Sequence, residues 1–300
     1  MSALIESLLK KHSNIGVVSY DAGGANLLNS LINNFLDIQF YLYIDGPASK
    51  IFDNENTILV DNKHDLFDSI DLLILGTGGT DFEKNLLIEA KDNEIFTISF
   101  LDHFVNYKKR FEIHNKFIFP DLCFVSDNYS YEIALKELYP YKNIHICKNY
   151  YIDSLKYFLK KDVNKDSKNI LYVLENLDEK WESKLAWKIA FQHFYNNLFL
   201  NNSNFNHIIV RPHPKDDINI YADIHDYENV SFDMNISGLN SLKKVSTVVG
   251  IESYFLYLSS QCGFNVYTSI PNDIRKPRLP KDSYKVIKKN GTQNNKKETS

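Results

Sequence analysis

The sequence has little cysteine, no long apolar run and no strong excess of either charge. Its three cysteines, Cys123, Cys147 and Cys262, lack metal-binding spacing, and an odd number gives no sign of a disulfide framework. No apolar run approaches the roughly 18 to 20 residues that span a bilayer. The 34 basic and 38 acidic residues are well mixed, so the general basic footprint of a nucleic-acid-binding protein is excluded.

The first residues also lack the basic start, long apolar core and small-residue cleavage site of a signal peptide. We therefore expect a cytoplasmic protein that binds no nucleic acid. Lysines between residues 281 and 297 leave peripheral contact with the inner face of an anionic membrane open, although a solubilising tail is the simpler explanation.

The remaining composition is that of a globular chain long enough for two domains. Of the 300 residues, 44% are hydrophobic and 14% aromatic, and an ordinary domain takes roughly 150 residues. Short apolar runs alternate with glycine or polar breaks and helix-like segments, which is typical of parallel sheets covered on both faces. The predicted strands are 15–19, 38–44, 72–75, 95–101, 122–125, 169–173, 207–210, 230–232, 247–249 and 265–268, and the predicted helices are 25–35, 82–90, 129–138, 180–199, 237–245 and 254–262.

One polar, charged segment interrupts this pattern. We interpret residues 159–168 as a linker between an N-terminal, acceptor-side domain, 1–158, and a C-terminal, donor-binding domain, 169–287. Residues 288–300 are rich in lysine and asparagine and are expected to form a disordered tail. The predicted fold class is α/β, with two doubly wound, Rossmann-like domains facing a central cleft.

Ligands of such sheets bind beyond the carboxyl ends of the strands, so the residues after each apolar run are the site candidates. Two of these breaks are rich in glycine, which lets the backbone approach a ligand closely. Neither carries the full dinucleotide fingerprint or the ending of a P-loop, and a tight turn explains each equally well. The candidate acceptor and loop residues are Gly23, Gly24, Asn26, Gly78, Gly79 and Thr80.

Two breaks offer a general base. Asp21 follows the first apolar run and directly precedes the first glycine loop. Asp102 and His103 follow the fourth run, where an adjacent carboxylate and imidazole supply a titratable group near neutral pH. A helix cap for Asp21 and a structural role for His103 are the alternative explanations.

A cationic loop, RPHPK, follows the strand predicted at 207–210. Its two prolines rigidify the loop and present Arg211, His213 and Lys215 as a cluster that suits a phosphate or diphosphate. A rigid structural turn is the alternative, but the clustering of charge favours phosphate binding.

A second anion site is predicted at the sequence GIES, which precedes the helix 254–262. Ser253 and the free amides at this helix start suit an anionic oxygen, with Gly250 ending the strand and Glu252 available for ribose hydroxyls. An ordinary N-cap is the alternative. Two such loops at neighbouring strand ends favour a nucleotide-phosphate site.

The loops VRPHPK and GIES, with the segment 263–271, resemble the C-terminal half of bacterial GT-B glycosyltransferases that carry an HP motif. These include sialyltransferases and Kdo transferases of capsule and lipooligosaccharide assembly and, more distantly, glycerophosphotransferases of teichoic acid synthesis. The resemblance implies a GT-B-like fold in which His213 and Ser253 contact the donor phosphate. In the sialyltransferases an acidic pair before glycine supplies the base, whereas only Asp45 precedes Gly46 here. Asp45 therefore competes with the other candidates, among which we favour Asp21.

The predicted function is transfer of a sugar from a nucleotide-sugar donor to a bacterial surface glycan or glycolipid, with a CMP-nonulosonate or Kdo-type donor ahead of a UDP-sugar. A base removes the acceptor proton while Arg211, His213 and Ser253 stabilise the leaving phosphate. No cofactor and no metal are expected, since no DxD motif is present. The alternatives are a UDP-sugar 2-epimerase or nucleotide-sugar hydrolase of the same architecture, and a non-catalytic sugar-nucleotide-binding protein of polysaccharide assembly.

Overall fold

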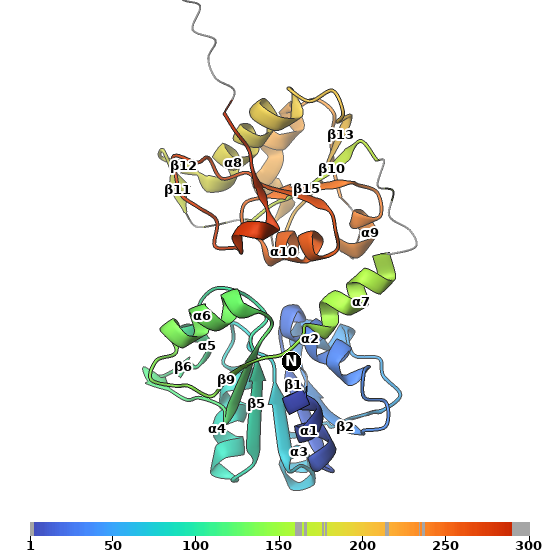
Figure 1. Cartoon of the computed structure of the whole chain (residues 1–300), viewed down its shortest axis with the longest axis vertical. Coiled ribbons are helices and arrows are strands. Elements are labelled where there is room, and N and C mark those ends of the chain that lie inside the picture. The colour runs from blue at the N-terminus through green and yellow to red at the C-terminus, as the bar shows by residue number, and fades with distance from the viewer. Residues whose placement is uncertain are drawn as a thin grey trace, which may run out of the picture. The chain divides into compact units, whose positions relative to one another are not determined.

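The computed structural model of the chain describes residues 3–159, 164, 167–175, 177, 179–213, 216–233, 235 and 238–289. The chain divides into two compact units, Met1–Ser154 and Leu155–Ser300, each built around one parallel sheet (Figure 1). This confirms the predicted α/β class with two doubly wound, Rossmann-like units. Much of the expected linker, 160–163, 165 and 166, and nearly all of the expected tail, 290–300, lie outside the described residues.

The sheet of the first unit has the strand order β3-β2-β1-β4-β5-β8-β9, and its neighbouring strands pair in parallel. The order reverses between β1 and β4, so the carboxyl ends of these two strands mark the switch point. The strands are β1 (Ile15–Ser19), β2 (Phe40–Ile44), β3 (Thr57–Leu59), β4 (Leu72–Leu75), β5 (Phe96–Phe100), β8 (Leu122–Val125) and β9 (Ile144–Ile146).

Helices cover both faces of this sheet because successive side chains of each strand point to opposite faces. Val17 packs into one core cluster with residues of α1 and α2, and its neighbour Val18 packs into another with residues of α3 and α4. The elements besides the main sheet are α1 (Ala3–Lys11), α2 (Ala22–Ile32), η1 (Gly46–Lys50), α3 (Lys63–Ser69), α4 (Phe82–Asp92), α5 (Tyr107–Arg110), the antiparallel pair β6 (Glu112–Ile113) and β7 (Lys116–Phe117), α6 (Asn128–Glu137) and α7 (Tyr150–Leu159).

The sheet of the second unit has the strand order β14-β13-β10-β15-β16-β17, and its order reverses between β10 and β15. All strands predicted from the sequence are present in the two main sheets, whose strands β3, β9 and β17 were not predicted. The remaining elements are β10 (Asn169–Val173), β13 (His207–Arg211), η3 (Ile218–Asp226), β14 (Val230–Phe232), α9 (Gly238–Leu242), β15 (Thr247–Gly250), α10 (Tyr254–Gln261), β16 (Asn265–Thr268), η4 (Lys281–Ser283) and β17 (Lys285–Val286).

The helix predicted for 180–199 begins later than expected. Its first residues form an antiparallel hairpin of β11 (Lys180–Trp181) and β12 (Lys184–Leu185). The turn residues Glu182 and Ser183 have φ angles of 48° and 65°, which no right-handed helix allows. The helix α8 therefore spans Ala186–Phe194 and continues as the π-helix η2 (Tyr195–Phe199).

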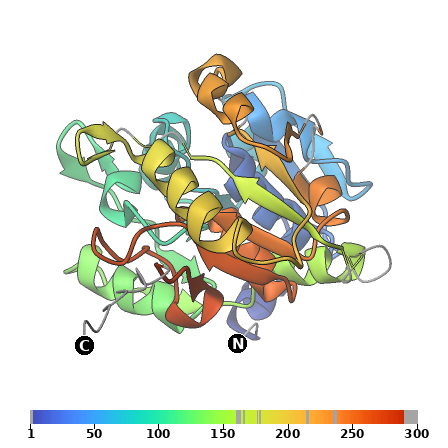
Figure 2. The ribbon, with the colours of Figure 1, turned by 90° about the horizontal axis from the view of Figure 1, so that it is seen from above.

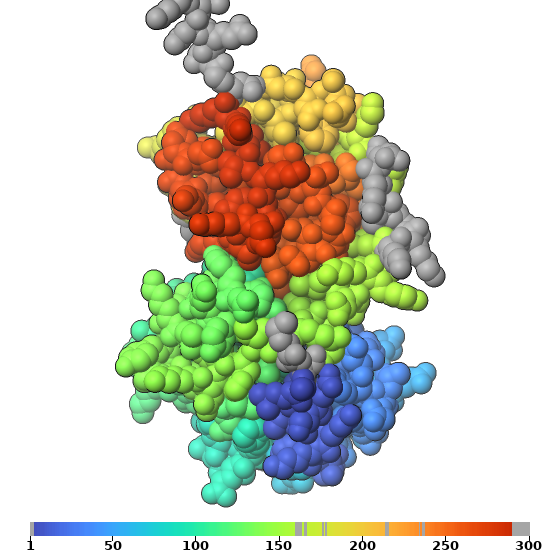
Figure 3. Space-filling model, viewed as in Figure 1, coloured from blue at the N-terminus to red at the C-terminus, as the bar shows by residue number. Residues whose placement is uncertain are grey.

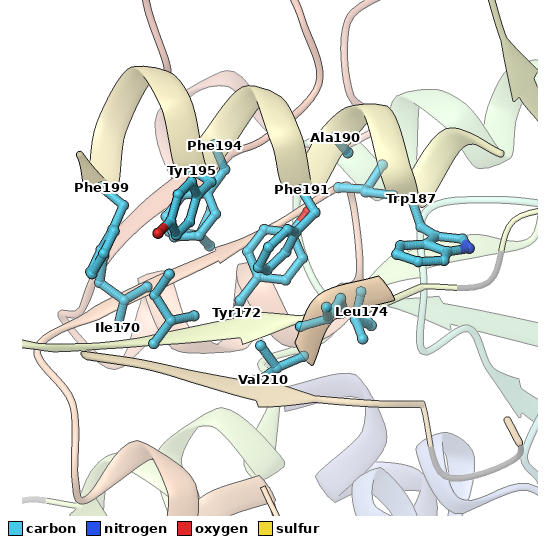
Figure 4. Close-up of a cluster of buried hydrophobic side chains, with 14 of the residues drawn as sticks. Ile170, Tyr172, Leu174, Trp187, Ala190, Phe191, Phe194, Tyr195, Phe199 and Val210 are labelled. Atoms are coloured by element: carbon cyan, nitrogen blue, oxygen red, sulfur yellow. The ribbon is translucent and has the colours of Figure 1, made fainter. Parts of the chain in front are cut away.

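Aromatic side chains of α8 form the core over β10 of the second unit (Figure 4). The rings of Phe191 and Phe194 lie 4.8 and 4.9 Å from the ring of Tyr172, centroid to centroid. Figure 2 shows α8, in yellow, lying across the strands of this sheet. This packing fixes β10, at whose carboxyl end a candidate site is found.

Every helix among the described residues is too short or too polar to span a bilayer.

Candidate functional site

Three acidic side chains gather at the switch point of the first unit. Asp21 follows β1 as the N-cap of α2, and Asp102 follows β5. Glu83 lies in the first turn of α4, shortly after the glycine loop that follows β4. The sequence predicted Asp21 and Asp102 but missed Glu83, because an acidic residue in the first turn of a helix is common for reasons of the helix dipole alone.

Glycine is required in the loops because these carboxylates pack against bare backbone. A Cβ atom added to Gly23 would lie 2.1 Å from Asp102 Oδ2. At Gly78 it would lie 2.9 Å from both carboxylate oxygens of Glu83 and 3.1 Å from Asp21 Oδ2. The two predicted glycine loops therefore serve close contact between backbone and carboxylates, and Gly78 separates Asp21 from Glu83.

Asp21 joins the loop after β1 to the loop after β4. The backbone N–H of Gly79 donates to Asp21 Oδ2 at 2.7 Å. Although Asp21 occupies the N-cap position of α2, its side chain makes no capping hydrogen bond. The carboxylate is thus directed toward the β4 loop, at the edge of the sheet where this topology places ligands.

Arg110 at the end of α5 pairs with Asp102 and fastens the same loop. Its Nη1 atom donates to Asp102 Oδ1 at 2.6 Å and to Thr77 Oγ1 at 2.9 Å, and it also donates to the carbonyl of Thr77. The side chains of Arg110 and Asp102 are each 15% exposed. Asp102 therefore shares its charge with a cation, whereas the bond from Gly79 to Asp21 comes from a neutral amide.

Glu83 is a buried acid with one engaged oxygen. The residue is 4% exposed, and its Oε1 accepts the backbone N–H of Tyr20 at 2.9 Å. Its Oε2 is buried and has no hydrogen-bond partner among the described residues. Burial raises the pKa of Glu83, and the nearby charges of Asp21 and Asp102 act in the same direction.

The other candidates of the first unit make local contacts. His103 Nδ1 accepts the backbone N–H of Phe104 at 2.7 Å, so the neutral ring carries its proton on Nε2 and offers a donor rather than a base there. Asp45 accepts the backbone N–H of Gly46 at 2.6 Å as the N-cap of η1. Asn26 Nδ2 donates to the carbonyl of Ala22 at 2.7 Å, and the backbone N–H of Phe82 donates to Thr80 Oγ1 at 3.4 Å. A Cβ added at Gly24 would lie 3.3 Å from Gly76 Cα.

The switch point of the second unit holds a carboxylate that the sequence analysis missed. Glu175 follows β10 directly, and its Oε1 accepts the backbone N–H groups of Glu252 and Ser253 at 2.8 and 2.7 Å. Burial raises its pKa to about 7, and the charge of Glu252 adds to this shift. The rule that placed candidates after each strand would have found Glu175, since it stands two residues beyond Val173, the last residue of β10.

Glu252, expected to bind ribose, is engaged by two arginines. Oε1 accepts Arg275 Nη2 at 2.9 Å and Arg278 Nε at 3.0 Å, and Oε2 accepts Arg275 Nη1 at 2.8 Å and the backbone N–H of Arg278 at 2.9 Å. Burial opposes its ionisation, but these hydrogen bonds outweigh burial and lower its pKa to about 2. Through these bonds Glu252 holds the segment after β16 in place. Figure 3 shows the last described part of the chain, in red, over much of the visible face of this unit.

Arg211, expected to face a phosphate, forms an ion pair inside the second unit. Its Nη1 atom donates to Asp233 Oδ2 at 2.7 Å and to the carbonyl of Asn235 at 3.0 Å. The side chains of Arg211 and Asp233 are only 12% and 1% exposed. His213 is exposed, and Lys215 lies outside the described residues.

The two predicted donor loops do share one edge of the second sheet. Val173 of β10 is in register with Arg211 on one side and with Gly250 on the other, which places these two residues roughly 10 Å apart. A Cβ added at Gly250 would lie 2.9 Å from the carbonyl oxygen of Val173. Ser253 is the N-cap of α10, and its Oγ accepts the backbone N–H of Phe255 at 3.2 Å.

Within the described part of the chain, no group of three or more His, Cys, Asp or Glu side chains is arranged to hold a metal ion.

Comparison with known proteins identifies the fold. No protein-family model and no curated protein matches the sequence. The structure is similar to UDP-GlcNAc 2-epimerase from Neisseria meningitidis bound to UDP-GlcNAc, with 14% identity and a TM-score of 0.57 over 85% of this chain and 82% of that one. It is similar to S. aureus MnaA with UDP, with 10% identity and a TM-score of 0.61 over 85% and 79%. The chain has a GT-B-like fold.

A third similar structure is the wall teichoic acid polymerase TagF soaked with CDPG, with 14% identity and a TM-score of 0.50 over 85% of this chain and 70% of that one. At sequence identities this low, the similarity establishes the fold and does not establish the activity. The two sheets that each reverse their strand order, at β1/β4 and at β10/β15, agree with this GT-B-like architecture.

Proposed function

We propose that the chain is a glycosyltransferase that uses a pyrimidine nucleotide-sugar donor and an acceptor hydroxyl of a surface glycan or glycolipid. The observation that carries this proposal is the carboxylate of Asp21 at the switch point of the first unit, held by the backbone N–H of Gly79 at 2.7 Å. The similar structures named above contain UDP-GlcNAc, UDP or CDPG, which supports a uridine or cytidine nucleotide as the donor. A CMP-nonulosonate or Kdo-type sugar rests on the sequence resemblance of the RPHPK and GIES loops and the segment 263–271.

In the proposed reaction Asp21 removes the proton of the acceptor hydroxyl as its oxygen attacks the anomeric carbon. The bond between that carbon and the phosphate oxygen breaks, and the nucleotide leaves with the electron pair. The proposed contacts of the leaving phosphate are His213, which is exposed two residues after β13, and Ser253 at the start of α10. Arg211 supports this edge of the sheet through Asp233.

Nucleotide binding provides the first test. In a thermal-shift panel of CMP, UDP, CDP and GDP, the pyrimidine nucleotides are expected to raise the unfolding temperature, because a ligand that binds the native state stabilises it. Turnover of the preferred donor is expected to fall strongly in Asp21→Asn and to stay near the wild-type value in Asp45→Asn, which tests the competing candidate base. No stabilisation by any nucleotide, or equal turnover in both variants, would contradict the proposal.

A UDP-sugar 2-epimerase is the second candidate. It is favoured by the two carboxyl groups of Asp21 and Glu83, which both lie close to Gly78, since two neighbouring carboxyl groups suit the removal and return of a proton. Two of the similar structures contain UDP-GlcNAc or UDP. Incubation with UDP-GlcNAc without acceptor distinguishes the two, because epimer or free sugar formed at full rate would exclude the transferase.

A further inference from the structure

Glu83 is buried at the switch point of the first unit, and within the described part of the chain it forms no salt bridge. It is 4% exposed and belongs to the first turn of α4. One oxygen accepts the backbone N–H of Tyr20 at 2.9 Å, and the other has no hydrogen-bond partner among the described residues. An ionised carboxylate in such a place loses hydration that one neutral amide does not replace.

The charged groups around Glu83 come from four places in the fold. Asp21 at the start of α2 and Asp102 after β5 both disfavour a negative charge on it. Two cations, Arg110 of α5 and Lys84 of α4, line the same small cavity as Glu83. Each is bonded elsewhere, Arg110 to Asp102 at 2.6 Å and Lys84 to Asp81 at 2.8 Å.

The carboxyl groups of Glu83 and Asp21 both lie close to Gly78. A Cβ at this position would lie 2.9 Å from both oxygens of Glu83 and 3.1 Å from Asp21 Oδ2. If both carboxylates were ionised, two like charges would face each other across one glycine, and their repulsion would oppose the bond from Gly79 to Asp21. A negative charge on Asp21 therefore disfavours a second negative charge on Glu83, as for any two carboxyl groups that lie close together.

We propose that Glu83 is a positioning residue that holds a proton, so that its buried side chain does not repel the carboxylate of Asp21 from its hydrogen bond to Gly79. The role of Asp21 as base rests on the function proposed above, whereas the proton on Glu83 does not. During the reaction the acceptor proton passes to Asp21, and Glu83 retains its own proton throughout. Above the pH at which Glu83 ionises, Asp21 is repelled from Gly79 and turnover falls.

The first experiment measures stability against pH and needs no substrate. A raised pKa in the folded state gives stability that is complete below the unfolded-state value of 4.5 and is lost as the pH rises through the folded-state value. Glu83→Gln keeps the acceptor for Tyr20 but cannot ionise. Its unfolding temperature relative to the wild type is expected to rise by roughly 2–4 °C between pH 5 and pH 8.

The control is Asp92→Asn, which removes an exposed carboxylate from the end of the same helix. Its unfolding temperature should follow the wild type across the pH range. Parallel curves for the wild type, Glu83→Gln and the control would overturn the proposal, because Glu83 would then carry no proton beyond its ordinary range.

The second experiment measures turnover against pH with the donor found in the nucleotide panel. The alkaline fall of wild-type turnover is expected to move to higher pH in Glu83→Gln and to stay in place in Asp92→Asn. A stability shift with an unmoved turnover profile would overturn the positioning role. If no donor is turned over, the proposed function fails, and the stability curves still decide whether Glu83 holds the proton.

Discussion

The backbone N–H groups of Glu252 and Ser253 both donate to one carboxylate oxygen of Glu175, at 2.8 and 2.7 Å. These amides stand just ahead of α10, where the helix favours a negative charge. The second unit therefore supplies its own anion at the amides to which the sequence analysis assigned a donor phosphate. In the proposed reaction a phosphate that binds there has to share or replace these two bonds.

Glu175→Gln is expected to stabilise the protein at alkaline pH. Burial raises the pKa of Glu175 to about 7 from an ordinary 4.5, so the wild type loses stability as the pH rises through this range. The glutamine keeps an oxygen for both amides but no charge, and we expect a gain of about 1–3 kcal/mol at pH 8 and little change at pH 4.5. Urea denaturation at the two pH values measures this. Glu228→Gln, at an exposed position, serves as the control, and equal gains at both pH values would refute the assignment.

Glu252→Gln is expected to lower stability at neutral pH. The two arginines bonded to Glu252 hold its pKa near 2 against the opposing effect of burial, so its contribution is present above 4.5 and is lost as the pH falls through about 2. Because Arg278 is half exposed, we expect a moderate loss of about 1–3 kcal/mol at pH 7. Denaturation curves should converge for variant and wild type near pH 2, and a constant difference would show that the charge is not responsible.

Gly78→Ala and Gly79→Ala form a matched pair in one loop. A Cβ at Gly78 meets Glu83 at 2.9 Å and Asp21 at 3.1 Å, whereas at Gly79 the nearest atom is Asp21 Oδ2 at an ordinary 3.7 Å. We expect Gly78→Ala to cost about 1–3 kcal/mol and Gly79→Ala to stay within about 0.5 kcal/mol. Chemical denaturation of both variants is the measurement, and equal costs would mean that flexibility of the loop, not the space at Gly78, determines the effect.

His213→Ala and Arg211→Lys separate binding from stability in the RPHPK loop. His213 is exposed, so its removal is expected to leave the unfolding temperature unchanged and to weaken nucleotide binding by roughly tenfold. Arg211 is buried against Asp233, and lysine keeps the charge but not the planar fork, so stability should fall. Calorimetric titration and thermal unfolding of both variants test this contrast. Weaker nucleotide binding in Arg211→Lys together with lower stability in His213→Ala would mean that Arg211 binds the phosphate and His213 has the structural role.

The strands and two candidate residues of the first unit could be predicted because they depend on short stretches of sequence. Apolar runs located the strands, and the rule that ligands lie beyond strand ends located Asp21 and Asp102. Glu83 was not found, because its burial depends on the packing of α4 against the loops after β1 and β4. The hairpin at 180–185 was missed as well, since Glu182 and Ser183 are not residues that favour a left-handed φ.

In the second unit the sequence pattern predicts the local structure of the candidate site but not its long-range ion pairs. The sequence GIES correctly indicates a helix start with Ser253 as its cap. It does not indicate that Glu252 is paired with Arg275 and Arg278, because those partners lie beyond another strand and are brought back only by the tertiary fold. For the same reason the sequence does not indicate the ion pair between Arg211 and Asp233, although an arginine in such a loop is a typical phosphate ligand.

The bonds made by the segment after β16 also set the size of any fragment that can be studied alone. A second unit cut before Arg278 would leave the buried carboxylate of Glu252 short of a counter-ion. Ile287 is 2% exposed in the aromatic core, and its carbonyl lies 3.3 Å from His193 Nε2 of α8. A recombinant fragment for nucleotide titrations must therefore retain residues through Ile287, and fragments that end earlier will report on a damaged core.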